Sequence, residues 1–296
     1  MQILKIGLIR EGKLPADARV ALTPAQCRAI QQNFPVQIVV QPSPHRCFSD
    51  ETFRTEGVEI SENLTDCDIL LGIKEVPIPQ LLEGKTYFFF SHTIKKQAHN
   101  RALLQAILTK NIRLIDYEVL TDERGVRLIA FGKFAGMVGT HNGLLGYGLR
   151  TGAYTLPRLH DLHDYAEAKD FYKTVKFPPM RVVLTGGGRV AGGALEVLQD
   201  ADFQRVTIED FLTKDFDAPV FVRLHPKDYA ARNDGNPFEK SDYYADPSVF
   251  HSTFEQFSAR TDLFINGIFY DNRAPRFFEI EDMRRADFQI KVIADI

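Results

Sequence analysis

The stretch from Arg181 to Leu198 constrains the fold of this chain more than any other. A short apolar run, Val182 to Leu184, meets three consecutive glycines, and an apolar helix face follows from Ala191. Glycine permits a positive φ and lets the backbone approach a ligand closely. A helix that starts there presents unpaired N–H groups and a positive dipole end, which suit a pyrophosphate. The pattern predicts a strand, a tight turn and a helix.

The glycines fit a dinucleotide-binding fingerprint. Gly186-x-Gly188-x-x-Ala191 has the spacing of that motif in its Gly/Ala form. The alternative is a glycine-rich turn between a strand and a helix that binds no ligand. An acidic residue that binds the ribose is expected about twenty positions later, at the tip of the second strand. Thr207 stands there, in a pattern with Asp210 that resembles a helix cap, so the choice between NAD and NADP stays open.

The composition is that of a globular protein. A length of 296 residues suffices for two domains, and 44% of the residues are hydrophobic and 25% charged. The net charge of −3 gives no electrostatic case for nucleic acid or a membrane surface, and no apolar run approaches the length of a membrane span. Three widely spaced cysteines and no signal-like start predict no metal site, no disulfide framework and a cytoplasmic location.

Residues 1–133 are predicted to form a layered α/β domain. Thr23 caps a helix that begins at Pro24, and a second helix is expected over 95–108. Alternation of strands and helices indicates a parallel sheet. Apolar strands are expected at 3–9, 36–40, 67–73, 87–90 and 112–115.

Residues 134–296 are predicted to form a Rossmann-type, doubly wound parallel sheet. In 134–154 the glycines recur at spacings of three and four, which predicts a helix that joins the domains and packs closely on a neighbouring helix. Because the chain stops inside an apparent core strand, the domain is expected to be incomplete at its C-terminus. Further expected features are strands at 203–207, 220–224, 262–268 and 290–296, a helix at 279–286, a surface excursion at 157–179 and an inserted loop at 225–257.

A titratable side chain follows each of three predicted strands in the first domain. These side chains are Lys74, His92 and Glu118. The carboxyl ends of parallel strands share one edge of the sheet, where ligands bind, so a shared cleft is expected. Lysine and histidine there are candidate proton carriers. The alternatives are a surface lysine, a histidine at a helix N-terminus and a glutamate in a salt bridge.

Two arginines are candidates to bind a carboxylate through the fork of the guanidinium group. They are Arg19, before the helix start in DARVALTP, and Arg127, in VRLIAF. The alternative for Arg19 is a loop-anchoring ion pair with Asp17 or Glu11. The alternative for Arg127 is a solvated residue of a strand.

Several segments together resemble one family. They are DARVALTP, LLGIKEVP, KTYFFFSHTIKKQ, RLIDYEVLTDERGVRLIAFGKFAG and DLFINGIFYDNRAPR. These segments are similar to lysine-forming saccharopine dehydrogenases, and most to the lysine–2-oxoglutarate reductase half of the bifunctional lysine-degrading enzyme, within the alanine dehydrogenase and transhydrogenase superfamily. The resemblance covers nearly the whole chain. It implies a reversible conversion of saccharopine to lysine and 2-oxoglutarate with NAD or NADP.

The resemblance also implies roles for single residues. Lys74 and His92 match the two acid–base positions, Glu118 matches a carboxylate that tunes them, and Arg19 and Arg127 match contacts to the substrate carboxylates. In the second domain, the matches are a cofactor loop at Gly186, Gly188, Arg189 and Val190, and a turn near the nicotinamide at Asn266 and Gly267. The implied partner is a small amino-acid substrate, and nothing indicates the oligomeric state.

Two other functions stay open at this point. Alanine dehydrogenase resembles the ARVALTP segment, Lys74, His92 and the glycine loop equally well, but it lacks the agreement over RLIDYEVLTDERGVRLIAFG. The other alternative is a nucleotide-binding regulatory module without catalysis.

Overall fold

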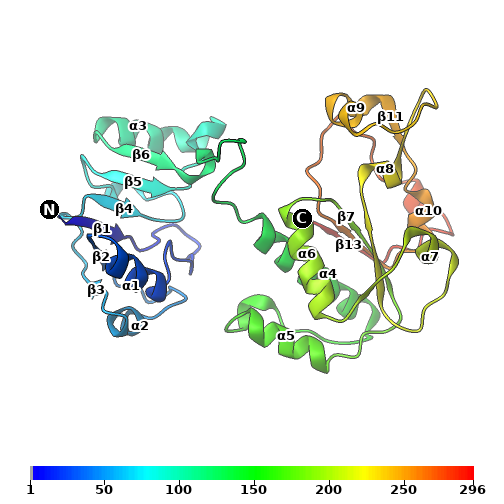
Figure 1. Cartoon of the computed structure of the whole chain (residues 1–296), viewed down its shortest axis with the longest axis horizontal. Helices are drawn as coiled ribbons and strands as arrows, with labels where there is room; N and C mark the ends of the chain where they lie inside the picture. The colour runs from blue at the N-terminus through cyan, green and yellow to red at the C-terminus, as the bar shows by residue number, and fades with distance from the viewer. Residues whose placement is uncertain (1–2) are drawn as a thin grey trace. The chain divides into compact units, whose positions relative to one another are not determined.

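The computed structural model describes residues 3–296 as two compact units, one ending at Ala130 and one spanning Phe131–Ile296 (Figure 1). Each unit has a parallel sheet with helices packed against it. The α/β class predicted from the sequence is therefore confirmed.

The first unit contains a parallel sheet with the strand order β3-β2-β1-β4-β5-β6. The chain fills the sheet in one direction from β1 to β3 and in the other from β4 to β6. The carboxyl ends of β1 and β4 therefore flank a topological switch point, which is where open α/β sheets bind ligands. The strands are β1 (Leu4–Leu8), β2 (Val36–Val40), β3 (Glu59–Ile60), β4 (Ile69–Leu71), β5 (Thr86–Phe89) and β6 (Arg113–Asp116).

The helices of this unit are α1 (Pro24–Asn33), α2 (Asp50–Thr55) and α3 (Arg101–Thr109). The predicted start of α1 is confirmed, because Thr23 caps it in a reciprocal pair of hydrogen bonds with Gln26. The helix expected over 95–108 begins only at Arg101. Two 3₁₀ turns, η2 (Thr93–Lys95) and η3 (Ala98–Asn100), occupy the region before it.

The second unit has the strand order β13-β12-β7-β9-β8, with all strands parallel. β9 pairs with β7, and β8, which precedes β9 in the chain, lies at the edge of the sheet. Burial agrees with these places, because β9 is almost entirely buried whereas both residues of β8 are exposed. The strands are β7 (Arg181–Thr185), β8 (Gln204–Arg205), β9 (Val220–Leu224), β12 (Leu263–Asn266) and β13 (Val292–Asp295).

Helices cover both faces of this sheet. One face packs against α4 (Gly132–Thr151), α5 (Tyr165–Thr174) and α6 (Arg189–Asp200), and the other against α7 (Ile208–Thr213) and α10 (Glu255–Ser258). The side chains of β7 alternate accordingly, with Val182 and Leu184 on the first face and Val183 on the second. Within residues 3–296 no helix is long and apolar enough to cross a membrane.

Three segments of the second unit differ from expectation. The excursion at 157–179 contains α5, whose Ala168 and Tyr172 are buried in the core. The helix expected at 279–286 is only the 3₁₀ turn η7 (Asp282–Arg284), none of whose residues is buried. The apparent core strand at 290–296 is β13, an edge strand whose residues alternate between half-buried and exposed. Hydrophobicity along the chain does not distinguish an edge strand from a central one.

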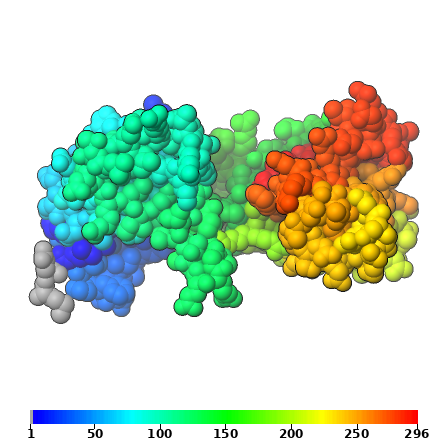
Figure 2. Space-filling model, turned by 90° about the horizontal axis from the view of Figure 1, so that it is seen from above, coloured from blue at the N-terminus to red at the C-terminus, as the bar shows by residue number. Residues whose placement is uncertain are grey.

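The insertion after β9 is a small subdomain. It contains α8 (Pro226–Tyr229), α9 (Lys240–Ala245) and an antiparallel pair formed by β10 (Ala230–Arg232) and β11 (Phe250–Ser252). Figure 2 shows this yellow-to-orange segment as a rounded body on the surface of the second unit. Aromatic side chains hold it together, with Tyr243 packed edge-on against Phe250.

One glycine of α4 lies in close contact with α6. A Cβ on Gly136 would lie 1.9 Å from the carbonyl oxygen of Val190, and a Cβ on Gly193 would lie 1.9 Å from that of Lys133. Each helix therefore brings a glycine against the backbone of the other. The prediction of close packing on a neighbouring helix is confirmed for Gly136, whereas Gly139 and Gly143 face the sheet, with Ile296 and Ala294 as neighbours.

We expect Gly136→Ala and Gly193→Ala each to lower the free energy of unfolding by about 1–3 kcal/mol, because overpacking forces the two backbones apart. Gly192→Ala is the matched control, since a Cβ there meets no atom within 4 Å and alanine favours a helix by about 1 kcal/mol over glycine. Urea unfolding followed by circular dichroism measures the change. Equal effects of all three substitutions would contradict this account of the contact.

A buried histidine joins α4 to α5. His141 is fully buried; its Nδ1 lies 2.7 Å from the Tyr172 hydroxyl and its Nε2 lies 2.8 Å from the carbonyl oxygen of Pro157. A neutral ring satisfies both contacts if Nε2–H donates to the carbonyl and Nδ1 accepts from the hydroxyl. Burial lowers the pKa of His141, and the hydrogen bond to Pro157 opposes this only in part.

Because the folded chain holds His141 neutral, its contribution to stability is present above the unfolded histidine pKa of about 6.5 and is lost as the pH falls below that value. We expect the unfolding free energy of the wild type to fall in this range more steeply than that of His141→Gln, by up to about 1.4 kcal/mol per pH unit. The control is His163→Gln, an exposed residue. Parallel pH profiles for the wild type and His141→Gln would refute the prediction.

Candidate functional site

Glu11 and Lys74 lie at the switch point of the first sheet. Glu11 follows β1, and its two carboxylate oxygens accept the backbone N–H groups of Ile73, at 2.7 Å, and of Lys74, at 2.8 Å. On the other side, the Phe90 N–H donates to the carbonyl oxygen of Ile73 at 3.0 Å. The backbone that carries Lys74 is therefore held from both neighbouring strands.

The ammonium group of Lys74 makes no hydrogen bond or ion pair within residues 3–296. Asp17 lies within electrostatic range of it. The hydrogen bond from Arg19 holds the pKa of Asp17 below its usual value, and the charge of Lys74 adds to that effect. The guanidinium group of Arg19 donates hydrogen bonds to both carboxylate oxygens of Asp17, with Nε 2.9 Å from Oδ1. The loop-anchoring pair considered for Arg19 is thus present, and contact with a substrate stays a prediction.

His92 follows β5, the neighbour of β4, and is paired with a carboxylate that the sequence analysis missed. Its Nδ1 lies 2.6 Å from Oε1 of Glu75, whose Oε2 lies 2.6 Å from Nζ of Lys13. Burial opposes ionisation of Glu75, but the hydrogen bonds from Lys13 and His92 outweigh it and lower its pKa to about 2. A charged Glu75 that accepts Nδ1–H leaves Nε2 of His92 available for proton transfer. The sequence feature that could have pointed to a role for Glu75 is its position directly after Lys74.

Glu118 follows β6 and lies next to Lys95 and Arg127. Its Oε1 lies 3.2 Å from Nζ of Lys95 and 3.8 Å from Nη1 of Arg127, and it makes no hydrogen bond or ion pair with Lys74 or His92. The second oxygen, Oε2, is buried and has no hydrogen-bond partner within residues 3–296. A buried acceptor without a donor is costly unless a ligand satisfies it.

Asp116 ties the ends of β5 and β6 together. This buried carboxylate accepts the N–H and the hydroxyl of Ser91, at 3.2 and 2.5 Å, and the N–H of Glu118 at 2.8 Å. Ser91 precedes His92, so one carboxylate sets the positions of two candidate residues. The structure thus arranges the first-unit candidates as Lys74 near Asp17 and Arg19, His92 on Glu75, and Glu118 with Arg127.

The glycine turn of the second unit has the geometry of an anion-binding helix start. Gly186 has a φ of 109°, and a Cβ there would lie 2.6 Å from the carbonyl oxygen of Gly267. Gly188 is the N-cap residue of α6, and no side chain caps the helix. A 12-residue helix that begins at a glycine without a side-chain cap fits a pyrophosphate at its start. Arg189 and Val190 form the first turn of α6.

Asn266 is locked in orientation beside this turn. Its Oδ1 accepts the Thr185 hydroxyl at 2.7 Å, and its Nδ2 donates to Oδ1 of Asp295 at 2.8 Å. These three residues end the adjacent strands β7, β12 and β13. The structure brings Gly186 and Gly267 into contact, as a cofactor turn requires.

Basic side chains stand at the strand tip where NAD-binding folds commonly place an acid. Arg223 of β9 donates from Nε to the carbonyl oxygen of Gly186 at 2.8 Å, and a Cβ on Gly187 would lie 3.4 Å from the ring of His225. Burial lowers the pKa of Arg223, and the charge of Arg205 lowers it further. Neither arginine has an ion pair within residues 3–296. Thr207 follows β8 and caps α7 by accepting the Asp210 N–H at 3.0 Å, as its pattern with Asp210 predicts.

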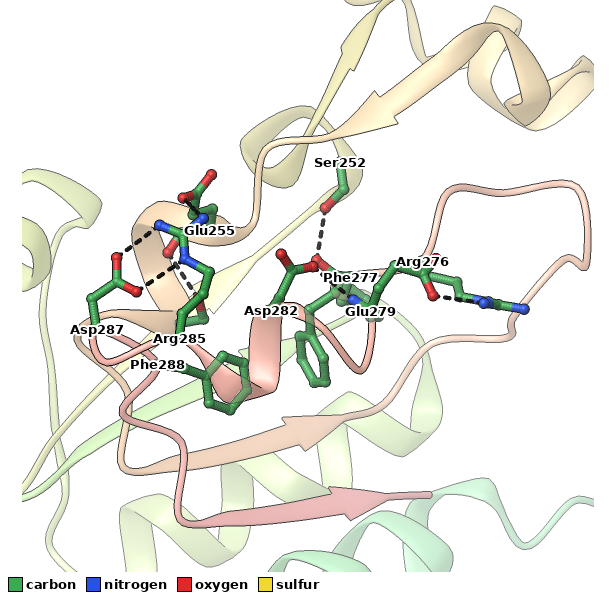
Figure 3. A pocket seen from close by; sticks show the side chains of 11 residues that line it. Ser252, Glu255, Arg276, Phe277, Glu279, Asp282, Arg285, Asp287 and Phe288 are labelled. Atoms are coloured by element: carbon green, nitrogen blue, oxygen red, sulfur yellow. Dashed lines mark hydrogen bonds and ion pairs between the residues drawn. The ribbon is translucent and has the colours of Figure 1, made fainter.

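A cavity of about 190 Å³ in the second unit is lined by residues within 252–258 and 276–288, away from the glycine turn in the sequence (Figure 3). The two segments that line this cavity precede β12 and β13 in the chain. They are joined where the Gln289 N–H donates a hydrogen bond to the carbonyl oxygen of Ser258. The charged side chains of the cavity pair with one another: Arg285 with Glu255 and Asp287, and Arg276 with Glu279. Among residues 3–296 no three His, Cys, Asp or Glu side chains form a group that could hold a metal ion.

Comparison with known proteins gives consistent results. Residues 7–138 match the family described as alanine dehydrogenase/PNT, N-terminal domain. The chain is 31% identical to the mitochondrial alpha-aminoadipic semialdehyde synthase of Bos taurus, over 94% of this chain and 32% of that protein. It is 25% identical to the NAD(+), L-lysine-forming saccharopine dehydrogenase of Emericella nidulans, over 99% of this chain and 73% of that protein.

The chain thus spans about a third of the length of the semialdehyde synthase. Among solved structures, an L-alanine dehydrogenase superposes with a TM-score of 0.60 at 15% identity, over 99% of this chain and 74% of that one. This likeness shows a shared fold.

Proposed function

We propose that this chain, whose residues 7–138 match the family described as alanine dehydrogenase/PNT, N-terminal domain, is an oxidoreductase that interconverts saccharopine with L-lysine and 2-oxoglutarate. One observation carries the proposal: Lys74 and the Glu75–His92 pair follow neighbouring strands at the carboxyl edge of the first sheet. Similarity to saccharopine dehydrogenases and alpha-aminoadipic semialdehyde synthases over most of the chain supports it.

The reaction needs two proton carriers. Hydride can leave the substrate carbon only when the adjoining secondary amine is unprotonated, so a base must first take that proton. A nicotinamide supplies the hydride acceptor when bound. Water then adds to the carbon of the substrate imine, and the C–N bond breaks as a proton reaches the lysine nitrogen. We assign the amine proton to Nζ of Lys74 and the protons of water addition and C–N cleavage to Nε2 of His92.

The remaining candidates of the first unit suit a substrate with three carboxylates. We assign Arg19 and Arg127 to these carboxylates because a guanidinium fork matches a carboxylate in two hydrogen bonds. The partners they have here, Asp17 and Glu118, would share or yield the guanidinium groups when the substrate binds. Glu118 keeps a buried free acceptor in Oε2, which suits a substrate N–H, and its charge tunes the proton carriers through space.

The second unit is assigned to the nicotinamide cofactor, with the pyrophosphate at Gly186, Gly188, Arg189 and Val190 and the nicotinamide near Asn266 and Gly267. We further propose that the cofactor is NADP. Arg205 and Arg223 bring two like charges together, neither forms an ion pair within residues 3–296, and a 2′-phosphate would neutralise them. NAD would present a ribose hydroxyl to these cations.

A cofactor-oxidation assay tests the proposed reaction. NADPH is mixed with the chain and either lysine plus 2-oxoglutarate or ammonia plus pyruvate, and the loss of absorbance of the reduced cofactor is followed. Consumption with lysine and 2-oxoglutarate is expected. Consumption only with pyruvate and ammonia would indicate an alanine dehydrogenase, and cofactor binding without turnover would indicate a regulatory module.

We expect Lys74→Met to lower kcat by about 100-fold or more, because removal of a general acid–base group costs about 10²- to 10⁴-fold. The dissociation constant for NADPH should stay within twofold, since Lys74 lies in the other unit. Lys173→Met, on the exposed face of α5, is the control and should keep wild-type turnover. Unchanged turnover in Lys74→Met would remove this residue from the mechanism.

Arg205→Ala is expected to weaken NADPH binding by about 10-fold or more, since a charge-assisted hydrogen bond contributes about 1.5–3 kcal/mol. Binding of NADH should change little. Arg223→Lys, which keeps the positive charge, should retain more of the preference for NADPH over NADH than Arg223→Ala does. Fluorescence titration with both cofactors measures the ratio of dissociation constants. If NADH and NADPH lose affinity equally, these arginines do not read the 2′-phosphate.

A further inference from the structure

We propose that Glu11 is a positioning residue that holds Lys74 in place at the switch point of the first sheet. The catalytic meaning of this proposal rests on the proposed function above. Its structural part concerns two backbone hydrogen bonds and stands independently of any activity.

The carboxylate of Glu11 extends the hydrogen bonding of β1 beyond the end of that strand. The β1–β4 pairing ends when the Ile9 N–H donates to the carbonyl oxygen of Leu71, after which the backbone of β1 departs. The next two N–H groups on this side, of Ile73 and Lys74, have no backbone partner there. Both donate to Glu11, at 2.7 and 2.8 Å. A side chain thus replaces the missing strand.

Both bonds form in a tightly packed place. Burial raises the pKa of Glu11, and the two N–H donors counteract that shift only in part. Gly72 leaves room for the contact, because a Cβ there would lie 2.7 Å from Cδ1 of Ile9 and 3.4 Å from Oε1 of Glu11. Without the carboxylate, two sheltered N–H groups would lose their acceptor, which is costly for a buried donor.

The geometry gives Glu11 a different task from Glu75. Glu75 contacts the imidazole of His92, whereas Glu11 contacts only the backbone at Lys74 and makes no hydrogen bond or ion pair with its ammonium group. Because these hydrogen bonds hold the backbone of Lys74, they also hold the Cα atom from which its side chain extends. A misplacement of 1 Å in a reacting group costs about 100-fold in rate, so such a hold has catalytic value.

The first experiment measures hydrogen exchange of the Ile73 and Lys74 amides by NMR. In Glu11→Gln one side-chain oxygen is replaced by an NH₂ group, which cannot accept. We expect exchange at one or both amides to accelerate by about 10- to 100-fold, the equivalent of an acceptor lost. Glu62→Gln is the matched control, because Glu62 is an exposed carboxylate that pairs with Arg10. Unchanged exchange in Glu11→Gln would overturn the inference.

The second experiment is a double-mutant cycle on kcat. Glu11→Gln alone should lower kcat by about 10- to 100-fold with NADPH affinity unchanged, whereas in the Lys74→Met background it should add almost nothing. Independent, multiplying effects would show that Glu11 does not act through Lys74 and would overturn the inference. An inactive wild-type chain would overturn the proposed function and the catalytic half of this inference, while the exchange rates would still decide the structural half.

Discussion

The second unit depends on the crossing of α4 and α6, where two glycines let the backbones touch. Gly136 faces the carbonyl of Val190, and Gly193 faces that of Lys133, so backbone atoms set the separation of the helices. Glycine inside a helix costs about 1 kcal/mol, and close packing offsets that cost. Because Val190 lies in the first turn of α6, the same contact fixes the helix start directly behind Gly186 and Gly188.

In both units, the candidate residues follow the carboxyl ends of parallel strands. In the first sheet these strands are β1, β4, β5 and β6, and in the second they are β7, β9 and β12. Three carboxylates of the first unit have separate tasks there: Glu11 binds backbone, Glu75 binds an imidazole and Glu118 faces an ammonium and a guanidinium group. A parallel sheet brings residues that are far apart in the sequence to the same edge, where they can contact one another.

The charge arrangement also separates the two chemical tasks of the proposed reaction. The proposed proton carriers Lys74 and His92 have the carboxylates Asp17 and Glu75 as neighbours. At the proposed cofactor turn, Arg223 donates to the carbonyl oxygen of Gly186, and the charge of Arg205 acts on Arg223. A phosphorylated dinucleotide would carry the charge that complements these two arginines.

Local patterns in the sequence determined the elements that local physics governs. Thr23 and Pro24 mark a helix start because a cap and a proline act within one turn, and the turn at Gly186 needs glycine because its φ is positive. The strand ends that bear Lys74, His92 and Glu118 followed from apolar runs. The glycine spacing of α4 predicted its close packing on a neighbouring helix, which holds for Gly136.

Only the tertiary structure decided which of these residues meet. The strand beside β7 is β9 and not β8, because burial of whole strands, and not their order in the chain, sets their place in a sheet. For the same reason, the tip beside the glycine turn carries Arg223 and His225 instead of an acid. The sequence did not predict the contact of Glu75 with His92, because the two residues lie on different strand ends. It did not predict the contact of Glu11 with the Lys74 backbone, because these residues lie far apart in the sequence. Sequence patterns report what one segment can form, whereas contacts across a sheet depend on how all the strands share the available burial.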